Sequence, residues 1–135
     1  MTDAFSNNAV LTDREDGMEP IADTVPTAAT STQASALTRG FIRELILGSD
    51  AKAYASHCQA IVDANEPDFA AVQVPMLILA GDEDKSAPLE GCKYILEHVG
   101  AAKKDLKILD ACGHWHCIEH PDRIAQEVET FCTSL

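Results

Sequence analysis

The segment "VPMLILAGDEDKSAP" at residues 74–88 decides the fold class. Its apolar residues run without interruption from Met76 to Ala80, between Pro75 and Gly81. A short continuous apolar run bounded in this way is typical of a strand that is buried on both faces of a parallel sheet. We therefore predict a strand over 76–80 whose carboxyl end opens into an acidic turn.

Helices and strands alternate after this strand. Apolar residues at intervals of three and four predict a helix over 89–99, and Gly100 ends the pattern. The segment "LKILDA" at 106–111 predicts a second strand, and Pro121 stands at the first position of a final helix. The order strand, helix, strand, helix predicts two parallel neighbouring strands joined by a right-handed crossover.

Two helices are predicted before the first strand. The stretch 35–47 has apolar residues at helical spacing, and Asp50 can cap a second helix over 51–65. The first 35 residues have little apolar periodicity, so we predict a tail that leads into loops and short helical turns. A sheet of only two strands would leave apolar faces and edges uncovered, which indicates part of a larger sheet.

Composition excludes several classes of partner. The 135 residues carry a formal net charge of -12, which disfavours binding to nucleic acid and to anionic membranes. Neither a leader pattern nor an apolar run of membrane-spanning length occurs, so a cytoplasmic protein is predicted. The five cysteines are an odd set without a compact spacing, which favours reduced thiols, and Cys92 and Cys132 are predicted to lie in the core.

Polar clusters follow both predicted strands. The first cluster holds Asp82, Glu83 and Asp84, and the second holds His114, His116 and His120. Because the carboxyl ends of adjacent parallel strands meet, we expect a carboxylate within reach of an imidazole, as in a general base oriented by an acid. A structural zinc site is the alternative, but it needs four converging ligands and the sequence offers one local cluster.

The two clusters together resemble the C-terminal portion of an α/β-hydrolase. Gly81 and Asp84 match the family's acid turn, and Gly113 and His114 match its histidine loop. The resemblance implies that Asp84 is the acid of a catalytic triad and His114 its base. Asp82 is the second choice for the acid and Glu83 the third. No cofactor is implied, and the substrate would be a small-molecule ester or lactone.

The upstream segments extend this resemblance. "GMEPIADTV" at 17–25 and "YASHCQAIVDAN" at 54–65 are similar to the cap of the beta-ketoadipate enol-lactonase branch. The implied fold is a partial α/β-hydrolase, in which a helical cap segment precedes strand, helix, strand and helix and the N-terminal half of the sheet is missing. The predicted divisions are a flexible tail (1–16), a helical cap-like segment (17–70) and a C-terminal part of the core (71–135).

One element of the family pattern is not found. Such enzymes carry their nucleophile on a Gly-x-Ser-x-Gly elbow, and no such motif occurs in these residues. The sequence therefore predicts a protein related to ester or lactone hydrolases whose acid and base lack a nucleophile in this chain. The alternative is a truncated, noncatalytic remnant that pairs with itself or with a partner chain through the exposed edge of the 76–80 strand. A role in aromatic catabolism or in secondary metabolism is left open.

Overall fold

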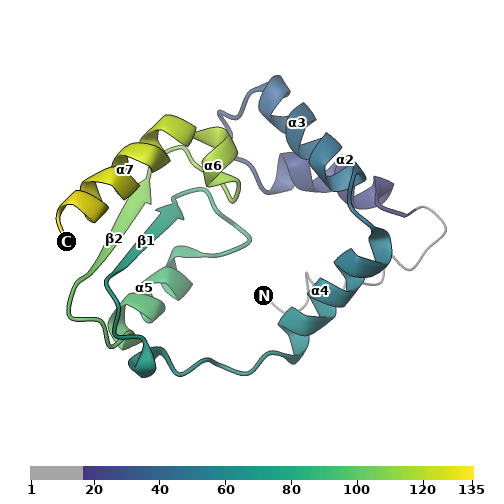
Figure 1. Ribbon diagram of the computed structural model, residues 1–135. Helices are drawn as coiled ribbons and strands as arrows, with labels where there is room; N and C mark the ends of the chain where they lie inside the picture. The colour runs from purple at the N-terminus through teal and green to yellow at the C-terminus, as the bar shows by residue number, and fades with distance from the viewer. Residues whose placement is uncertain (1–16) are drawn as a thin grey trace. The chain divides into compact units, whose positions relative to one another are not determined.

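The computed structural model describes residues 17–135, so the predicted tail at 1–16 lies outside the described residues. The elements are α2 (Glu19–Ala28), α3 (Ala36–Leu47), α4 (Ala51–Asp63), the short 3-10 helix η1 (Phe69–Ala71), β1 (Met76–Gly81), α5 (Leu89–His98), β2 (Lys104–Leu109), α6 (His116–Glu119) and α7 (Pro121–Thr133) (Figure 1).

The described residues form two compact units. The first comprises 17–28 and 35–66, and the second comprises 29–34 and 67–135. The domain boundary predicted at residue 70 stays a prediction, because compactness alone does not define a domain that folds independently. No helix of the described chain combines the length and the apolar character that a membrane crossing requires.

In the first unit, α2 and α3 pack against each other. Their buried residues include Ile21 on α2 and both Ile42 and Ile46 on α3. The prediction of loops and short helical turns, made from the weak apolar periodicity, is wrong over 19–28, because tertiary packing sustains a ten-residue helix there despite Pro26 in its interior. Burial of one helix face outweighs the poor local helix propensity.

The helices predicted at 35–47 and 51–65 are confirmed with small changes at their ends. The Ser35 side chain accepts a hydrogen bond from Thr38 N at 3.0 Å, which caps α3, and Gly48 ends that helix. The Asp50 side chain accepts from Ala53 N at 2.8 Å and caps α4. These side chains satisfy N–H groups that a helix start leaves without partners.

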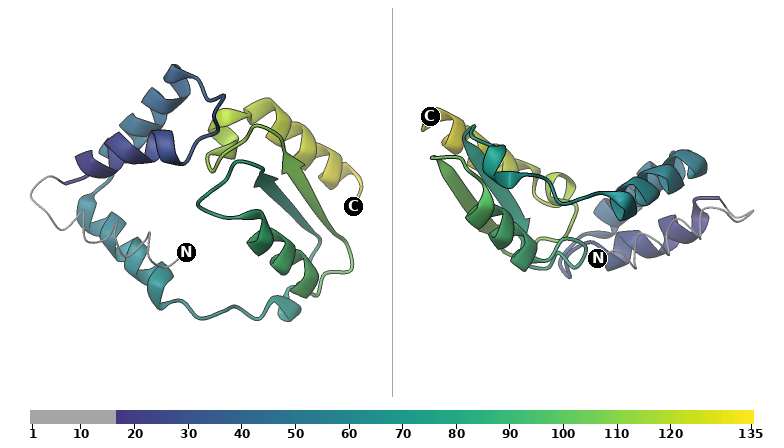
Figure 2. Two further views of the ribbon diagram at one scale, coloured as in Figure 1. Left: turned by 180° about the vertical axis from the view of Figure 1, so that it is seen from behind. Right: turned by 90° about the horizontal axis from the view of Figure 1, so that it is seen from below.

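The second unit contains the parallel pair β1 and β2, with Met76 opposite Lys104 and Gly81 opposite Leu109. Helices α5 and α7 lie on opposite sides of this pair (Figure 2). The strand predicted at 106–111 begins two residues earlier and ends two residues earlier. Lys104 is an exposed polar residue, so only its pairing with β1, and no apolar signal, marks it as part of the strand.

One edge of β1 carries no strand among the described residues. Met76 N and Asp82 N donate to carbonyl groups on the β2 side. Because N–H groups alternate between the two edges of a strand, those of Leu77 and Leu79 point to the opposite edge. The apolar residues 76–79 are only half-buried. This partial burial fits the prediction that the pair belongs to a larger sheet.

Part of the core of the second unit lies at the carboxyl ends of the strands. Leu109 and Cys112 are fully buried there. Cys132 is exposed and Cys92 is half-buried, so the prediction that both lie in the core is wrong for Cys132. Helix α7 has no buried residue, because two strands offer it too little surface to cover its apolar side.

Candidate active site

Three consecutive carboxylates follow β1, and each has a different partner. Asp84 Oδ2 lies 2.9 Å from His114 Nδ1. Asp82 Oδ1 accepts a hydrogen bond from the backbone N–H of Cys112 at 3.2 Å. The Glu83 carboxylate accepts from Thr32 N and Thr32 Oγ1 at 2.7 and 3.0 Å. The acid turn therefore brings Asp84 alone of these three to the histidine.

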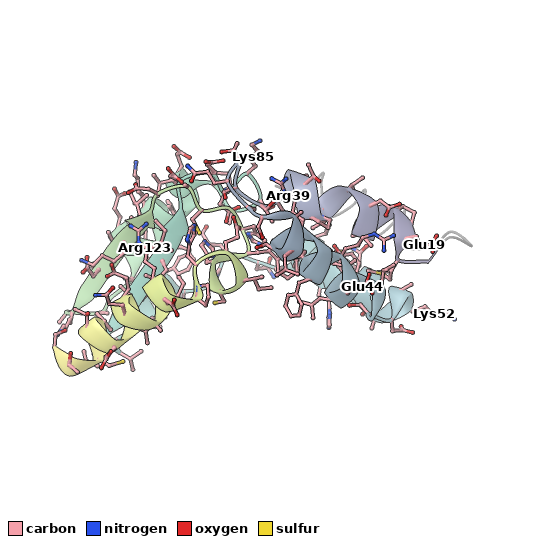
Figure 3. The ribbon with its side chains drawn as sticks, turned by 90° about the horizontal axis from the view of Figure 1, so that it is seen from above. Glu19, Arg39, Glu44, Lys52, Lys85 and Arg123 are labelled. Atoms are coloured by element: carbon pink, nitrogen blue, oxygen red, sulfur yellow. The ribbon has the colours of Figure 1, made fainter. Side chains whose placement is uncertain are left out.

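Both carboxylate oxygens of Asp84 have hydrogen-bond partners, and the side chain is only 2% exposed. Its Oδ1 accepts hydrogen bonds from Ser86 N and Ala87 N, both at 2.8 Å, and the following Lys85 is exposed (Figure 3). Burial alone would raise the pKa of this carboxyl, but the Ala87 N–H, the His114 ring and the Ser86 N–H together hold the pKa below its ordinary value. Asp84 is therefore an ionised acceptor with a fixed orientation.

His114 is anchored at one side and open at the other. Its backbone N–H donates to Ala29 O at 2.8 Å, and its Nδ1 faces Asp84. The side chain is 45% exposed, and no described hydroxyl or thiol is hydrogen-bonded to its Nε2. An imidazole whose Nδ1–H is held by a carboxylate keeps Nε2 free to accept a proton.

The backbone brings the histidine loop directly onto the end of β1. After β2, Ala111 adopts a positive φ of 53°, which turns the chain sharply. A Cβ on Gly81 would lie 2.2 Å from Cys112 O and 2.6 Å from Gly113 O. Glycine is therefore required at position 81, because only its absent side chain permits this approach.

The other two histidines of the cluster have structural partners of their own. His116 Nε2 accepts a hydrogen bond from Gly81 N at 3.1 Å, so this ring is neutral with its proton on Nδ1. His116 lies 4.0 Å from Asp84 Oδ2, and burial, only partly offset by that carboxylate, lowers its pKa. His120 Nε2 donates to Ala111 O at 3.0 Å. Neither partner could be read from sequence spacing, because the first depends on the meeting of the two turns and the second on the path of the histidine loop itself.

The residues considered for zinc binding are occupied in other ways. Burial, together with the nearby carboxylates of Glu119 and Asp82, raises the pKa of the Cys112 thiol to about 11. This cysteine is therefore a protonated thiol at neutral pH in the chain without a metal. In the part of the chain that the structure describes, no three His, Cys, Asp or Glu residues are grouped as a metal site.

Glu119, on α6, is a site residue that the sequence patterns do not identify. Its carboxylate accepts hydrogen bonds from the backbone N–H groups of Gly113, Trp115 and Ser31. No spacing in the sequence indicates the contact with Ser31, because Ser31 lies 88 residues away along the chain. Glu119 is thus part of the surroundings of His114.

Acidification is expected to destabilise the chain in two steps. The pKa of His116 is lowered in the folded state, so the unfolded chain binds this proton more tightly, and stability falls as the pH drops below the ordinary histidine value of about 6.5. The pKa of Asp84 is also lowered, so its contribution is lost as the pH falls through about 3.9 and below. Urea unfolding measured between pH 8 and pH 3 would resolve both steps.

The control for this pH profile is His116→Gln, whose amide oxygen can still accept from Gly81 N but does not titrate. This variant should lose the first step and keep the second. A first step of unchanged size in His116→Gln would contradict the assignment.

Comparisons with known proteins find hydrolases. No family model matches the chain. The 2-hydroxymuconate semialdehyde hydrolase of Pseudomonas putida is 35% identical over 68 residues, which cover 50% of this chain and 24% of that protein. The enol-lactonase from Burkholderia xenovorans LB400 matches with a TM-score of 0.85 at 25% identity, over 97% of this chain and 50% of that one. A thermophilic esterase from Thermogutta terrifontis matches with a TM-score of 0.85 at 18% identity, over 98% and 50%. The chain thus spans about half the length of these solved structures.

Proposed function

Because the chain has the fold of part of an α/β-hydrolase, we propose that Asp84 and His114 are the acid and base of a hydrolase that acts on ester or lactone bonds. The observation that carries the proposal is the 2.9 Å contact between Asp84 Oδ2 and His114 Nδ1 at the carboxyl ends of two parallel strands. In open parallel sheets this is where reacting groups gather.

The geometry supports a definite division of labour. His114 takes the proton of an attacking hydroxyl at Nε2 and passes it to the leaving oxygen, and then activates water in the same way. Asp84 fixes the ring and stabilises its protonated form. These 135 residues contain no Gly-x-Ser-x-Gly elbow, so the nucleophile must come from another polypeptide segment.

The comparisons support a carbonyl substrate of small size. The solved neighbours are named as an esterase and an enol-lactonase, and the curated relative is named as a semialdehyde hydrolase. Attack of an oxygen nucleophile on a carbonyl carbon is common to the first two. One fold hosts many reactions. The choice of an ester or lactone as the substrate therefore depends on the site as well as on these neighbours. The roles assigned to Asp84 and His114 need no cofactor.

The test is a chimera in which residues 17–135 replace the matched half of the Burkholderia xenovorans enol-lactonase. Hydrolysis of an aryl ester and of a simple lactone is measured for the chimera and for the 135-residue chain alone. We expect hydrolysis by the folded chimera and only background hydrolysis by the chain. A chimera that is folded by circular dichroism but hydrolyses neither substrate would reject the proposal.

A second candidate is a noncatalytic protein that pairs with itself through β1. The observation that favours it is the edge of β1 at which the N–H groups of Leu77 and Leu79 meet no strand among the described residues. Two copies related by a twofold axis could pair these edges in antiparallel fashion and form one four-stranded sheet. Such pairing would also cover half-buried apolar residues of β1.

Leu79→Pro tests this candidate, because proline removes the outward N–H without touching the bonds between β1 and β2. If the edges pair, sedimentation should find a dimer in the original chain and a dimer at least about tenfold weaker in the variant, since each lost interchain hydrogen bond costs about 1 kcal/mol. Ala51→Pro, at the first position of α4 and away from the edge, controls for the effect of proline itself. A monomeric original chain would exclude self-pairing.

A further inference from the structure

The segment 29–34, called the strap below, belongs to the same compact unit as the acid turn and the histidine loop. It joins α2 to α3 and runs beside α6 (Figure 1). Ala29 O accepts from His114 N at 2.8 Å, and Thr32 N donates to Glu83 at 2.7 Å. The strap is therefore tied to both turns that carry the acid and the base.

The carboxylate of Glu119 joins the strap to the histidine loop. Its Oε2 accepts from Ser31 N at 2.8 Å, and both oxygens lie 3.2 Å from Gly113 N. Its Oε1 also accepts from Trp115 N at 3.2 Å. Gly113 and Trp115 are the residues on either side of His114, so one side chain holds the N–H groups of the residues before and after the base.

The strap lies directly against this loop. A Cβ on Gly113 would be 2.6 Å from Ser31 N and 2.7 Å from Ala29 O. Three backbone N–H groups converge here, and an ionised carboxylate can accept from all of them because it has two oxygens and no hydrogen. An amide side chain would turn an NH₂ donor toward at least one of these donors.

We propose that Glu119 is a positioning residue, which fixes the backbone of His114 so that Nδ1 meets Asp84 while Nε2 stays open, and which makes this geometry depend on the strap. The use of that geometry in hydrolysis rests on the function proposed above. The positioning itself is a property of the 135-residue chain and is testable without any turnover.

The experiment compares the original chain with Glu119→Gln by NMR. Two signals are followed: the downfield proton of His114 Nδ1 in its hydrogen bond to Asp84, and the amide hydrogen exchange of Ser31 and Trp115. We expect Glu119→Gln to broaden or lose the Nδ1 signal. Exchange at both amides should be at least about tenfold faster, because each amide loses a hydrogen bond to a charged acceptor.

Two matched variants separate positioning from general effects of charge. Glu83→Gln should speed exchange at Thr32, because the Glu83 carboxylate contacts only the strap among these segments. The His114 Nδ1 signal should stay in place, because the bond from Glu83 N to Cys112 O is a backbone one and the strap remains bonded to the histidine loop through Ser31 N and Ala29 O. Glu129→Gln, at an exposed position on α7, should change neither signal. If Glu119→Gln does not fold, Glu119→Asp keeps the charge with a shorter reach and is judged by the same signals.

Unchanged exchange and an unchanged Nδ1 signal in folded Glu119→Gln would overturn the inference. Equal acceleration of every amide, including those between β1 and β2, would also overturn it, since Glu119 would then support the whole fold. Failure of the function proposal is distinguishable, because an inactive chimera leaves both NMR signals unaffected. In an active chimera, Glu119→Gln should lower kcat with little change in KM.

Discussion

Gly81→Ala is expected to reduce the free energy of unfolding by at least about 3 kcal/mol, at the upper end of what overpacking costs. The added Cβ would lie 2.2 Å from Cys112 O and 2.6 Å from Gly113 O. Both are backbone atoms of the loop that carries His114, so no side chain can rotate away to relieve the clash. Urea unfolding followed by circular dichroism measures the loss.

Gly91→Ala is the matched control for this substitution. Gly91 is the third residue of α5, and a Cβ there would meet nothing within 4 Å. Alanine is favoured over glycine in a helix, so this variant should be at least as stable as the original chain. If the two variants had the same stability, the close approach of the histidine loop to β1 would be incorrect.

His114→Ala is expected to reduce hydrolysis by the chimera by about 10⁶-fold, because base and nucleophile act as a unit in a triad. Asp84→Asn should cost less, on the order of 10⁴-fold, since it leaves the base in place but removes the acceptor that fixes its tautomer. Initial rates with an aryl ester would establish this order of effects.

The control for the histidine substitution is His57→Ala, at an exposed position on α4. It should retain the rate of the unsubstituted chimera. Hydrolysis that survives in His114→Ala would mean that another group accepts the proton, and the role proposed for His114 would then be wrong.

Local patterns predict both strands and most of the helices. The run from Met76 to Ala80 is apolar without interruption, and β1 occupies it with one further residue, Gly81. Helices α3, α4, α5 and α7 follow from spacing and from caps such as Asp50. Periodicity fails for α2, where Pro26 and a weak apolar pattern conceal a helix that packing against α3 maintains.

The site is predictable only in part, because some of its contacts join residues that are far apart in the sequence. Parallel neighbouring strands must bring their carboxyl ends together, so the meeting of Asp84 with His114 follows from topology. The partners of Glu119 and His116 do not follow, because they are backbone N–H groups that every residue carries. Their selection depends on where the loops lie in space.

The strap has a consequence for the order in which the molecule assembles. Its hydrogen bonds to Glu83 and Glu119 span 51 and 88 residues of sequence. Closing loops of that size costs more chain entropy than pairing β1 with β2, so these bonds are expected to form after the main folding barrier has been crossed. Loosening the strap should then speed unfolding while leaving the folding rate almost unchanged. The surroundings of the histidine would accordingly be the last part of the unit to form and the first to be lost.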